Sequence, residues 1–523
     1  MKNYLIHDIS LPFTAPSEEA VASAKKTVSR GGGRTVSAEV FRKSVDARKK
    51  DDIRFVYSVL CTVEGGDPKR LRSVGAAEEN YSSPEITPGE TPMSARPLVC
   101  GFGPAGIFAA LILAEHGYAP LVCERGPSPE RRTAKIQRFF STGELDTEGN
   151  VQFGAGGAGM FSDGKLMTRI NDPLCRYVLE KLSEFGAPRE ILVNARPHIG
   201  TDILTDVVQK AADRIIALGG RIYYDARIDG IKTDSAGRVT GVTAATGEIP
   251  CGALILAHGH SARDTYTLLK NRGYDIAPKP ISIGFRIEHL RCDIDRALYG
   301  DHAGDARLGA AEYNLSTRIG ATGVYTFCMC PGGEVVAAAS EEGGVVTNGA
   351  SRFARDGVNS NAACAVSLKV PDPMGLQRSL EQAAFRAGGG GYAAPVQTLG
   401  DFLEGKRGTE PSRIMPTYTR GEVSLADIAA ILPGNSAEAF AAGLRSFGRK
   451  IPGFDTPDAI LCGLETRTTA PYRMARGEDF TSPGHDNLYP CGEGAGWAGG
   501  ITSAAVDGIR CASALIRKFK AWS

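Results

Sequence analysis

Two stretches near the N-terminus alternate apolar and polar residues, Tyr4–Leu11 and Ile53–Val63, and this period of two predicts strands. Between them, Ser17–Ser29 and Ser37–Ala47 space their apolar residues in a way that predicts helices. Residues 1–76 are therefore expected to form a small α+β module. Residues 77–96, rich in Pro, Ser and Glu, are predicted to be a linker.

The longest uncharged segment is Pro97–Ala114, which matches the length of a membrane span. Two prolines and three glycines lie towards its N-terminal end, however, and polar, turn-rich chain follows it. The pattern instead predicts a strand at residues 97–100, a tight turn, and a helix over Ile107–Glu115. A second strand is predicted at residues 120–123.

Further apolar strands suggest that the chain returns to one sheet several times. Thr201–Leu218 has a helical pattern, and Arg221–Ile228 reads as a strand. A three-stranded meander follows, with turns at residues 235–237 and 246–247, and then a buried strand at residues 253–257. Leu488–Pro490 is predicted to be the last parallel strand, followed by a helix over Thr502–Phe519.

The region between these segments is predicted to be an inserted mixed α/β domain over residues 265–455. Two strands are expected around Pro331–Gly333, within residues 325–339, and helices over residues 425–432 and 436–447. The domain into which it is inserted is expected to comprise residues 97–264 and 456–523.

Composition changes this picture little. The net charge of the 523 residues is +1 and aromatic residues make up 7%, so nothing overall indicates nucleic acid or an anionic membrane as a partner. The first residues lack an apolar signal region, and we expect a cytoplasmic protein. None of the 12 cysteines lies in a CxxC pair, so no metal site is predicted and reduced thiols are expected.

The N-terminal module contains a basic cluster, interrupted by Asp46, Asp51 and Asp52. Acidic interruptions favour a solvated helix face, although contact with phosphate or an acidic partner is an alternative. The cluster comprises Arg42, Lys43, Arg48, Lys49, Lys50 and Arg54.

The glycines after the first strand of the large domain carry the clearest chemistry. Gly101 permits a tight turn, Gly103 lets the backbone approach a pyrophosphate, and Gly106 lets the helix pack on the strand. Glu124 ends the next strand, where its carboxylate can accept the ribose hydroxyls of an adenosine. This spacing predicts a dinucleotide site, but the glycines alone do not distinguish FAD from NAD.

From Ile53 to the C-terminus the chain resembles a group of bacterial and plastid FAD-dependent dehydrogenases or oxidoreductases, related to flavoproteins of the glutathione-reductase type. The resemblance rests on these motifs: Ser44–Lys50, Gly101–Gly106, Glu124–Gly126, Val151–Lys165, Gly259–Asp264, Phe327–Gly333, Glu465–Thr468 and Gly492–Gly496. It implies an α/β fold with a Rossmann-like FAD-binding domain of that type.

The resemblance also implies FAD as the cofactor. In such flavoproteins an acid, here Glu493, takes a ribityl hydroxyl, and the next helix directs its N-terminus at the flavin pyrimidine ring, where reduction places negative charge. The expected cofactor-binding residues are Gly101, Gly103, Pro104, Ala105, Gly106, Glu124, Arg125, Arg132, Gly157, Lys165, Ile228, Ala257, Gly259, Gly492, Glu493, Gly500 and Ile501.

Three residues are candidates for catalysis. Lys165 follows a glycine-rich loop and is expected near the flavin or at the surface. Arg467 is expected to orient a substrate carboxylate or to pair with Glu465. Cys330, two residues from Cys328 on a predicted strand, belongs either to a redox couple or to the core.

Further candidates flank the expected cavity. His258 and His260 are acid–base candidates by type, or they satisfy backbone carbonyls. Arg413 and Tyr418 are expected, with Arg467, on a ligand-facing wall.

The function expected from these residues is hydride transfer between flavin N5 and an unidentified small molecule. With only one dinucleotide fingerprint, NAD(P)H is expected only as a transient donor at the flavin. Flavin-dependent RNA modification and a non-enzymatic flavin redox sensor or electron-transfer partner are the alternatives. The oligomeric state is left open.

Overall fold

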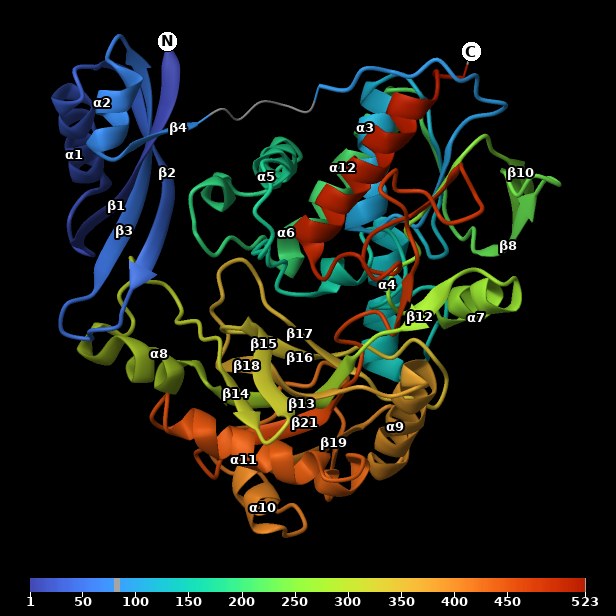
Figure 1. Cartoon of the computed structure of the whole chain (residues 1–523). Helices are drawn as coiled ribbons and strands as arrows, with labels where there is room; N and C mark the ends of the chain where they lie inside the picture. The colour runs from blue at the N-terminus through green and yellow to red at the C-terminus, as the bar shows by residue number, and fades with distance from the viewer. Residues whose placement is uncertain (80–84, 523) are drawn as a thin grey trace.

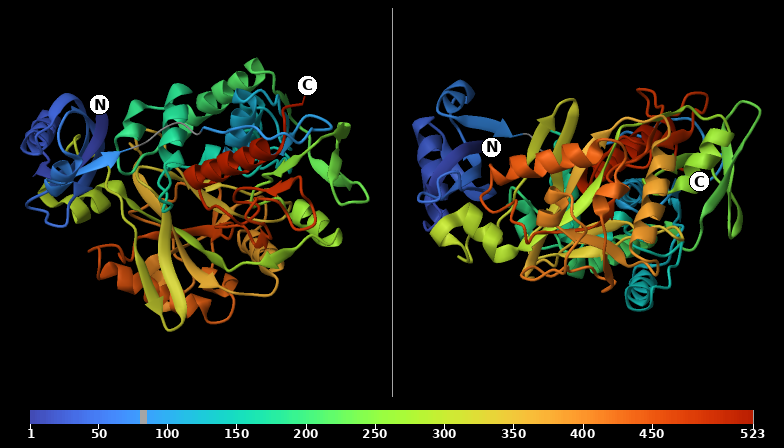
Figure 2. Two further views of the ribbon diagram at one scale, coloured as in Figure 1. Left: turned by 45° about the horizontal axis from the view of Figure 1, so that its top comes forward. Right: turned by 90° about the horizontal axis from the view of Figure 1, so that it is seen from below.

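The computed structural model describes residues 1–79 and 85–522 (Figure 1). The predicted linker lies partly outside these residues. The structure has three parts: an N-terminal module, an α/β part built on a parallel sheet, and a part built on a larger sheet (Figures 1 and 2). Among the residues described, no helix has both the length and the apolarity that a bilayer span requires.

The N-terminal module is a four-stranded antiparallel sheet in the order β2-β3-β1-β4, with two helices packed on it. Its elements are β1 (Lys2–Pro12), α1 (Ser17–Arg30), β2 (Arg34–Asp46), β3 (Arg54–Glu64), α2 (Pro68–Ser73) and β4 (Ala76–Glu79). The α+β prediction holds here, and the helix predicted over Ser17–Ser29 is α1.

The helix predicted over Ser37–Ala47 is wrong, because these residues form strand β2. Val36, Val40, Phe41 and Val45 favour a strand, since β-branched and aromatic side chains pack well on a pleated surface. Two register shifts against β3 hid their period of two.

The second part has a five-stranded parallel sheet in the order β23-β11-β5-β6-β7. A three-stranded antiparallel meander, β8-β9-β10, is inserted between β7 and β11, as predicted. The strands are β5 (Leu98–Cys100), β6 (Leu121–Cys123), β7 (Arg221–Tyr223), β8 (Ile228–Thr233), β9 (Val239–Ala244), β10 (Gly247–Pro250), β11 (Leu254–Leu256) and β23 (Leu488–Pro490).

Helices cover this sheet, and α3 and α12 lie side by side in Figure 1. Nearly every residue of α3 is buried, which explains why its sequence is apolar on all faces and resembles a membrane span. The helices are α3 (Pro104–Glu115), α4 (Pro129–Thr142), α5 (Leu174–Glu184), α6 (Thr201–Ala217) and α12 (Ile501–Lys518), with 3₁₀ turns at Ala158–Phe161 and Arg189–Leu192.

The third part is a seven-stranded sheet in the order β14-β15-β18-β13-β21-β19-β20, with two small ribbons, β12-β22 and β16-β17. Its strands are β12 (Ile276–Pro278), β13 (Ile281–Leu290), β14 (Ser316–Ile319), β15 (Thr322–Cys330), β16 (Glu334–Ala337), β17 (Thr347–Ala350), β18 (Asn359–Leu368), β19 (Ala394–Thr398), β20 (Val423–Leu425), β21 (Ile460–Glu465) and β22 (Tyr472–Met474).

Helix α7 (Arg263–Asn271) packs on β8 of the meander, and its Leu269 is buried with strands of the parallel sheet. The helices of the third part are α8 (Arg291–Tyr299), α9 (Pro373–Ala387), α10 (Leu399–Glu404) and α11 (Ser436–Gly448), with 3₁₀ turns at Gly300–His302 and Ile428–Ile431. Helix α11 packs on β14, β15 and β18, on the face turned away from the parallel sheet (Figure 1).

The structure of the third part bears on the helix, the strands and the boundaries predicted for it. The helix predicted over residues 425–432 is wrong, because the segment contains only the end of β20 and a 3₁₀ turn. The strands around Pro331–Gly333 exist as β15 and β16, but β16 pairs with β17. The domain boundaries stay predictions, although β21 belongs to this sheet and begins after the boundary predicted at residue 455.

Close backbone approaches set the geometry at the end of β5. Gly101 has φ +95°, which only glycine adopts readily, and a Cβ on Gly106 would lie 1.9 Å from the carbonyl oxygen of Gly101. The roles predicted for these two glycines, the turn and the packing of α3 on the strand, are confirmed.

Replacing Gly106 with Ala is therefore expected to destabilise the protein by about 3 kcal/mol, because the methyl group has no space. Thermal unfolding followed by circular dichroism measures the change. Gly323→Ala is the matched control, because its Cβ would only make an ordinary 3.5 Å contact with Ser367. Equal melting temperatures for both variants would contradict the packing described here.

Candidate functional site

A cavity of about 430 Å³ lies at the carboxyl ends of β5, β6, β11 and β23. The lining residues Gly101, Glu124, His258 and Glu493 come from the loops that follow these four strands. Ligands bind at this edge in open α/β sheets, and the volume lies within the ~300–1,000 Å³ typical of ligand sites.

Two helices begin at the cavity. Pro104 and Ala105 open α3, and Gly500 and Ile501 lie at the start of α12; all four line the wall. Neither helix has a side-chain hydrogen bond at its N-cap, Gly103 or Gly500. The free N–H groups and the positive helix ends therefore favour negative charge at two places in one cavity.

A glycine-rich loop, residues 152–159, forms another part of the wall. Its shape depends on Arg132, which is fully buried and donates to the carbonyl oxygens of Asn150, Val151, Ala155 and Gly157. The prediction that Arg132 contacts the cofactor is wrong, because its guanidinium lies beneath the loop and does not line the cavity. Its role is to fold the loop.

The acid after β6 is bound by backbone amides. Glu124 is buried and accepts from the N–H groups of Phe102 at 2.7 Å, Gly126 at 2.9 Å and Gly154 at 3.1 Å. It still lines the cavity, and a carboxylate with about four acceptor positions keeps one for a further donor. Glu124 thus connects the glycine turn to the glycine-rich loop.

Arg125 also lines the cavity, held by carboxylates. It pairs with Glu148 and Asp264, both at 2.9 Å, and stacks on Phe153 at 3.9 Å from the ring centre. Its planar face therefore forms a fixed section of wall.

Most of the predicted cofactor-binding residues line this one cavity. Those that do are Gly101, Gly103, Pro104, Ala105, Glu124, Arg125, Gly157, Lys165, Ile228, Ala257, Gly259, Glu493, Gly500 and Ile501. Gly106, Arg132 and Gly492 do not. Gly492 instead donates its N–H to Asp507 at 2.7 Å, and a Cβ there would meet Ala105.

Glu493 faces the cavity without a hydrogen-bond donor in the described part of the chain. Burial raises the pKa of its carboxyl to about 7, and Lys279 opposes this only in part. A carboxyl that lacks a donor within a cavity fits a ligand that brings hydroxyl groups.

The two histidines after β11 are neutral. Burial lowers the pKa of both His258 and His260 to about 4, and for His260 the nearby arginines 467 and 263 add to the effect. Both ring nitrogens of His258 are buried, and the backbone of Leu256 opposes the fall in its pKa only in part, so the two roles expected for this ring stay predictions. His260 contacts the hydroxyl of Ser261 at 2.9 Å.

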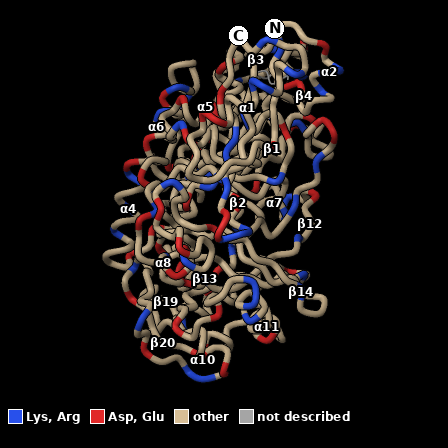
Figure 3. Tube along the Cα trace, turned by 90° about the vertical axis from the view of Figure 1, so that its left-hand side faces the viewer, with Lys and Arg blue, Asp and Glu red and all other residues tan. Residues whose placement is uncertain are grey.

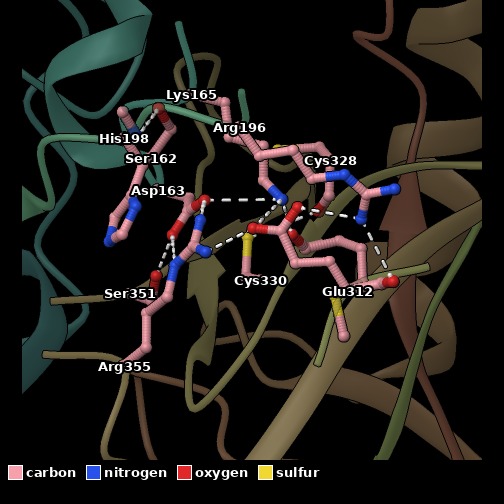
Figure 4. Close-up of polar contacts among 12 residues, drawn as sticks. Ser162, Asp163, Lys165, Arg196, His198, Glu312, Cys328, Cys330, Ser351 and Arg355 are labelled. Atoms are coloured by element: carbon pink, nitrogen blue, oxygen red, sulfur yellow. Dashed lines mark hydrogen bonds and ion pairs between the residues drawn. The ribbon is translucent and has the colours of Figure 1, made fainter. Parts of the chain in front are cut away.

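Lys165 lies on the wall within a charged cluster (Figure 4). Its ammonium group donates to the carbonyl oxygen of Met329 and lies 3.4 Å from Asp163 and 4.0 Å from Glu312. Arg355 pairs with both carboxylates. Burial opposes ionisation, but the cations dominate and lower the pKa of Asp163 and of Glu312.

Arg467 lines the cavity, yet its donors are taken. It pairs with buried Glu381 at 3.0 Å and donates to Ser340, while Arg263 holds the same carboxylate at 2.7 Å. Despite burial, these two arginines lower the pKa of Glu381 to about 2. The alternative pairing of Arg467 with Glu465 is wrong, because Glu465 binds Arg286.

Two residues predicted on the ligand-facing wall lie elsewhere. Arg413 pairs with Asp293 at the surface, and buried Tyr418 donates to the carbonyl oxygen of Tyr392. Cys330 is also absent from the lining, whereas Cys328 belongs to it.

Sequence reasoning missed Arg286, Asn348 and Glu381. Arg286 lies in β13, whose residues are nearly all buried, and binds Glu465 and the Oδ1 of Asn348. A charged residue inside an apolar strand pattern was the available signal for it. Glu381 and Asn348 had no comparable local signal.

The basic cluster of the N-terminal module lies on β2, the turn after it and the start of β3, so the predicted helix face is wrong. Arg48 pairs with Asp46 at 2.5 Å, and Arg54 pairs with Asp52 at 3.2 Å. Figure 3 shows basic and acidic positions interspersed on this side of the molecule.

One group of ligand-type side chains lies outside the cavity. Cys491, Asp507 and Cys511 are buried within 4.8 Å of one another. Asp507 is already paired with Arg476 and accepts from Gly492, so the carboxylate is engaged by the protein itself.

Arg467→Met is expected to lower the unfolding free energy by about 3 kcal/mol, because it removes a buried partner of Glu381. Differential scanning calorimetry measures the loss. Arg413→Met, which removes a surface pair, should leave the melting temperature unchanged. If Arg467→Met leaves the unfolding free energy unchanged, the buried pair with Glu381 is not needed for stability, and Arg467 would again be a candidate for binding substrate.

The raised pKa of Glu493 predicts a pH-dependent difference between wild type and Glu493→Gln. The folded state binds the proton more tightly than the unfolded state, so this contribution is present below pH ~4.5 and lost as the pH rises through about 7. Without ligand, wild type should lose about 1–3 kcal/mol relative to the variant between pH 5 and pH 8. Thermal melts at both pH values test this, and parallel curves would contradict it.

A sequence-family profile described as "FAD-dependent protein, C-terminal domain-like" matches residues 280–468. Among solved structures, the L-amino acid deaminase of Proteus vulgaris has 12% identity and a TM-score of 0.36, covering 83% of this chain and 93% of that one. The glycine oxidase of Bacillus cereus has 12% identity and a TM-score of 0.32, covering 81% and 95%. At these scores the overlap supports no conclusion about function.

A protein of Clostridium beijerinckii, titled "Uncharacterized protein", is 44% identical over 494 residues, which cover 92% of each chain. The profile that matches residues 280–468 is named for FAD-dependent proteins, which supports FAD as the cofactor. The chain belongs to the same family as the Clostridium beijerinckii protein.

Proposed function

We propose that this protein is an FAD-dependent oxidoreductase that transfers a hydride between flavin N5 and a small-molecule substrate. The observation that carries the proposal is the shared cavity. Gly103, Glu124 and Glu493 line it from the parallel-sheet part, and Cys328 and Arg467 line it from the seven-stranded part. A cofactor and a substrate can therefore meet in one enclosed space.

The residues present fit FAD. The start of α3 suits the pyrophosphate, Glu124 the adenosine ribose, and Glu493 a ribityl hydroxyl. The start of α12 suits the pyrimidine ring of the flavin, where negative charge develops on reduction. When bound, FAD supplies the redox chemistry, and the protein supplies position and charge.

The arrangement of the parallel sheet supports a finer assignment to the glutathione-reductase type. Strand order β23-β11-β5-β6-β7, with an antiparallel meander between β7 and β11, is the pattern that the sequence resemblance implies. No second glycine fingerprint accompanies it in the sequence, so a pyridine nucleotide would act as a visiting donor at the flavin.

The substrate side of the cavity contains few free charges. Since Glu381 already holds Arg467, Lys165 is our candidate for the group that orients an anionic substrate atom. Displacing its contact with the Met329 carbonyl would free the ammonium group. Phe327 and Val346 provide apolar surface that keeps water away from this region.

Purified protein should show the visible absorption of an oxidised flavin, or gain it when FAD is added. Gly103→Val should lower the FAD content about tenfold, because the new side chain fills the gap between the turn and the glycine-rich loop, where its Cβ would lie 3.6 Å from the Cα of Gly157. Its φ of −83° lets a valine fit without backbone strain, so the melting temperature of the FAD-free protein should stay close to that of wild type.

Anaerobic mixing with NADH, NADPH and a panel of small organic acids, amines and alcohols then identifies the donor by flavin bleaching. A protein that binds no flavin, alone or with added FAD, would refute the proposed function.

A further inference from the structure

Cys328 and Cys330 occupy the wall of the cavity in two layers. Cys328 lines the cavity, and Cys330 lies fully buried directly behind it. The Cys330 thiol donates a hydrogen bond of 3.3 Å to the carbonyl oxygen of Cys328. The two cysteines are thus hydrogen-bonded neighbours, and Cys328 is the one that lines the cavity.

A β-bulge creates this arrangement. On β15, Phe327 pairs with Ala363 of β18 and Cys330 pairs with Asn361, so Cys328 and Met329 together oppose a single residue. Cys328 has φ +43°, a left-handed conformation that disfavours residues with a Cβ by about 1 kcal/mol or more. Strain of this kind persists where the surrounding structure enforces it, and functional sites concentrate it.

Two cations enclose the pair. Arg286 donates to the carbonyl oxygen of Cys328 at 2.7 Å, and Lys165 donates to that of Met329. Arg286 is fixed by Glu465 and Asn348, and Lys165 by the cluster of Asp163 and Glu312 shown in Figure 4. Asp163 and Glu465 are the negative groups that face the sulfurs, so the cations do not act alone.

The chemistry of the two sulfurs differs accordingly. The hydrogen bond from Cys330 outweighs burial and, with Arg286 and Lys165, lowers the pKa of Cys328 to about 5, while the pKa of Cys330 rises. For Cys123, by contrast, burial and the nearby Glu124 carboxylate raise the pKa to about 12. A thiolate that faces the cavity beside a buried thiol is the arrangement of a redox-active pair.

We propose that Cys328 and Cys330 form a dithiol–disulfide couple that exchanges two electrons with the FAD of this cavity. In the forward direction the Cys328 thiolate and the Cys330 thiol form one S–S bond, and the S–H bond of Cys330 breaks. The electron pair and that proton pass to oxidised FAD, giving the anionic reduced flavin, FADH⁻. Atoms and charge balance, and the reverse step reduces the disulfide.

This inference rests on the proposed function, because it requires FAD in the cavity. It adds a second electron store, so the substrate class would include disulfides and thiols that reach Cys328 from the cavity. Exchange with such a partner proceeds through a mixed disulfide on Cys328, which Cys330 then resolves.

Anaerobic dithionite titration of the air-oxidised holoprotein tests the couple. Wild type should take up about four electron equivalents per FAD, two for the flavin and two for the disulfide. Cys328→Ser and Cys330→Ser should each take up about two. Cys292→Ser, which changes an exposed cysteine on α8, should behave as wild type.

Peptide mass spectrometry provides a readout that needs neither flavin nor a variant. Trypsin releases residues 319–352 as one peptide that contains only these two cysteines. From air-oxidised wild type, denatured with N-ethylmaleimide, this peptide should be unlabelled and lighter by a pair of hydrogen atoms, and it should take up two labels after reduction.

The outcomes separate the two proposals. Suppose that the protein binds FAD. If wild type then takes up only about two electron equivalents, or if both thiols stay free to react with the label, this inference is overturned and the proposed function stays intact. A disulfide whose reduction is independent of the flavin does the same. A protein that binds no FAD overturns both.

Discussion

The site depends on how closely the backbones of different loops approach one another at the carboxyl edge of the parallel sheet. A Cβ on Gly101 would lie 2.3 Å from the carbonyl oxygen of Ala257, and one on Gly494 would lie 2.6 Å from the N–H of Gly259. Without side chains, the loops after β5, β11 and β23 come together and leave their N–H groups facing the cavity. Helices α3 and α12 begin at this edge for the same reason, and so both point positive ends at one ligand.

Ionic networks fix the seven-stranded part against this edge. Glu381 of α9 holds Arg263 at the start of α7 and Arg467 after β21, and all three side chains are buried. Asp163, from the parallel-sheet part, holds Arg355 after β17. Breaking such a pair leaves an uncompensated buried charge, which is costly. The two sides of the cavity therefore keep a defined spacing, as the proposed hydride transfer would require.

Local signals allowed much of this to be predicted from the sequence. Gly101–Gly106, the meander and the helix after Glu493 each depend on residues close together in the chain, and all were found. Strand β2 was misread because its two register shifts disturbed the period of two. The partners of Arg132 and Arg467 could not be found, since Glu381 lies 86 residues from Arg467 and only the folded chain brings them together. The bulge in β15 likewise decided that Cys328, and not Cys330, reaches the cavity.

The segment at residues 193–198 contacts both the N-terminal module and the cavity wall. Its backbone exchanges hydrogen bonds with Lys43 on the outer strand of the N-terminal module, and His198 forms a bridge with Lys165. Strand β2 thereby gains a neighbour along its open edge, which hinders unwanted pairing with other chains. The same short segment connects the module to the cavity wall through backbone hydrogen bonds. A displacement of the module would therefore shift the backbone at Lys165.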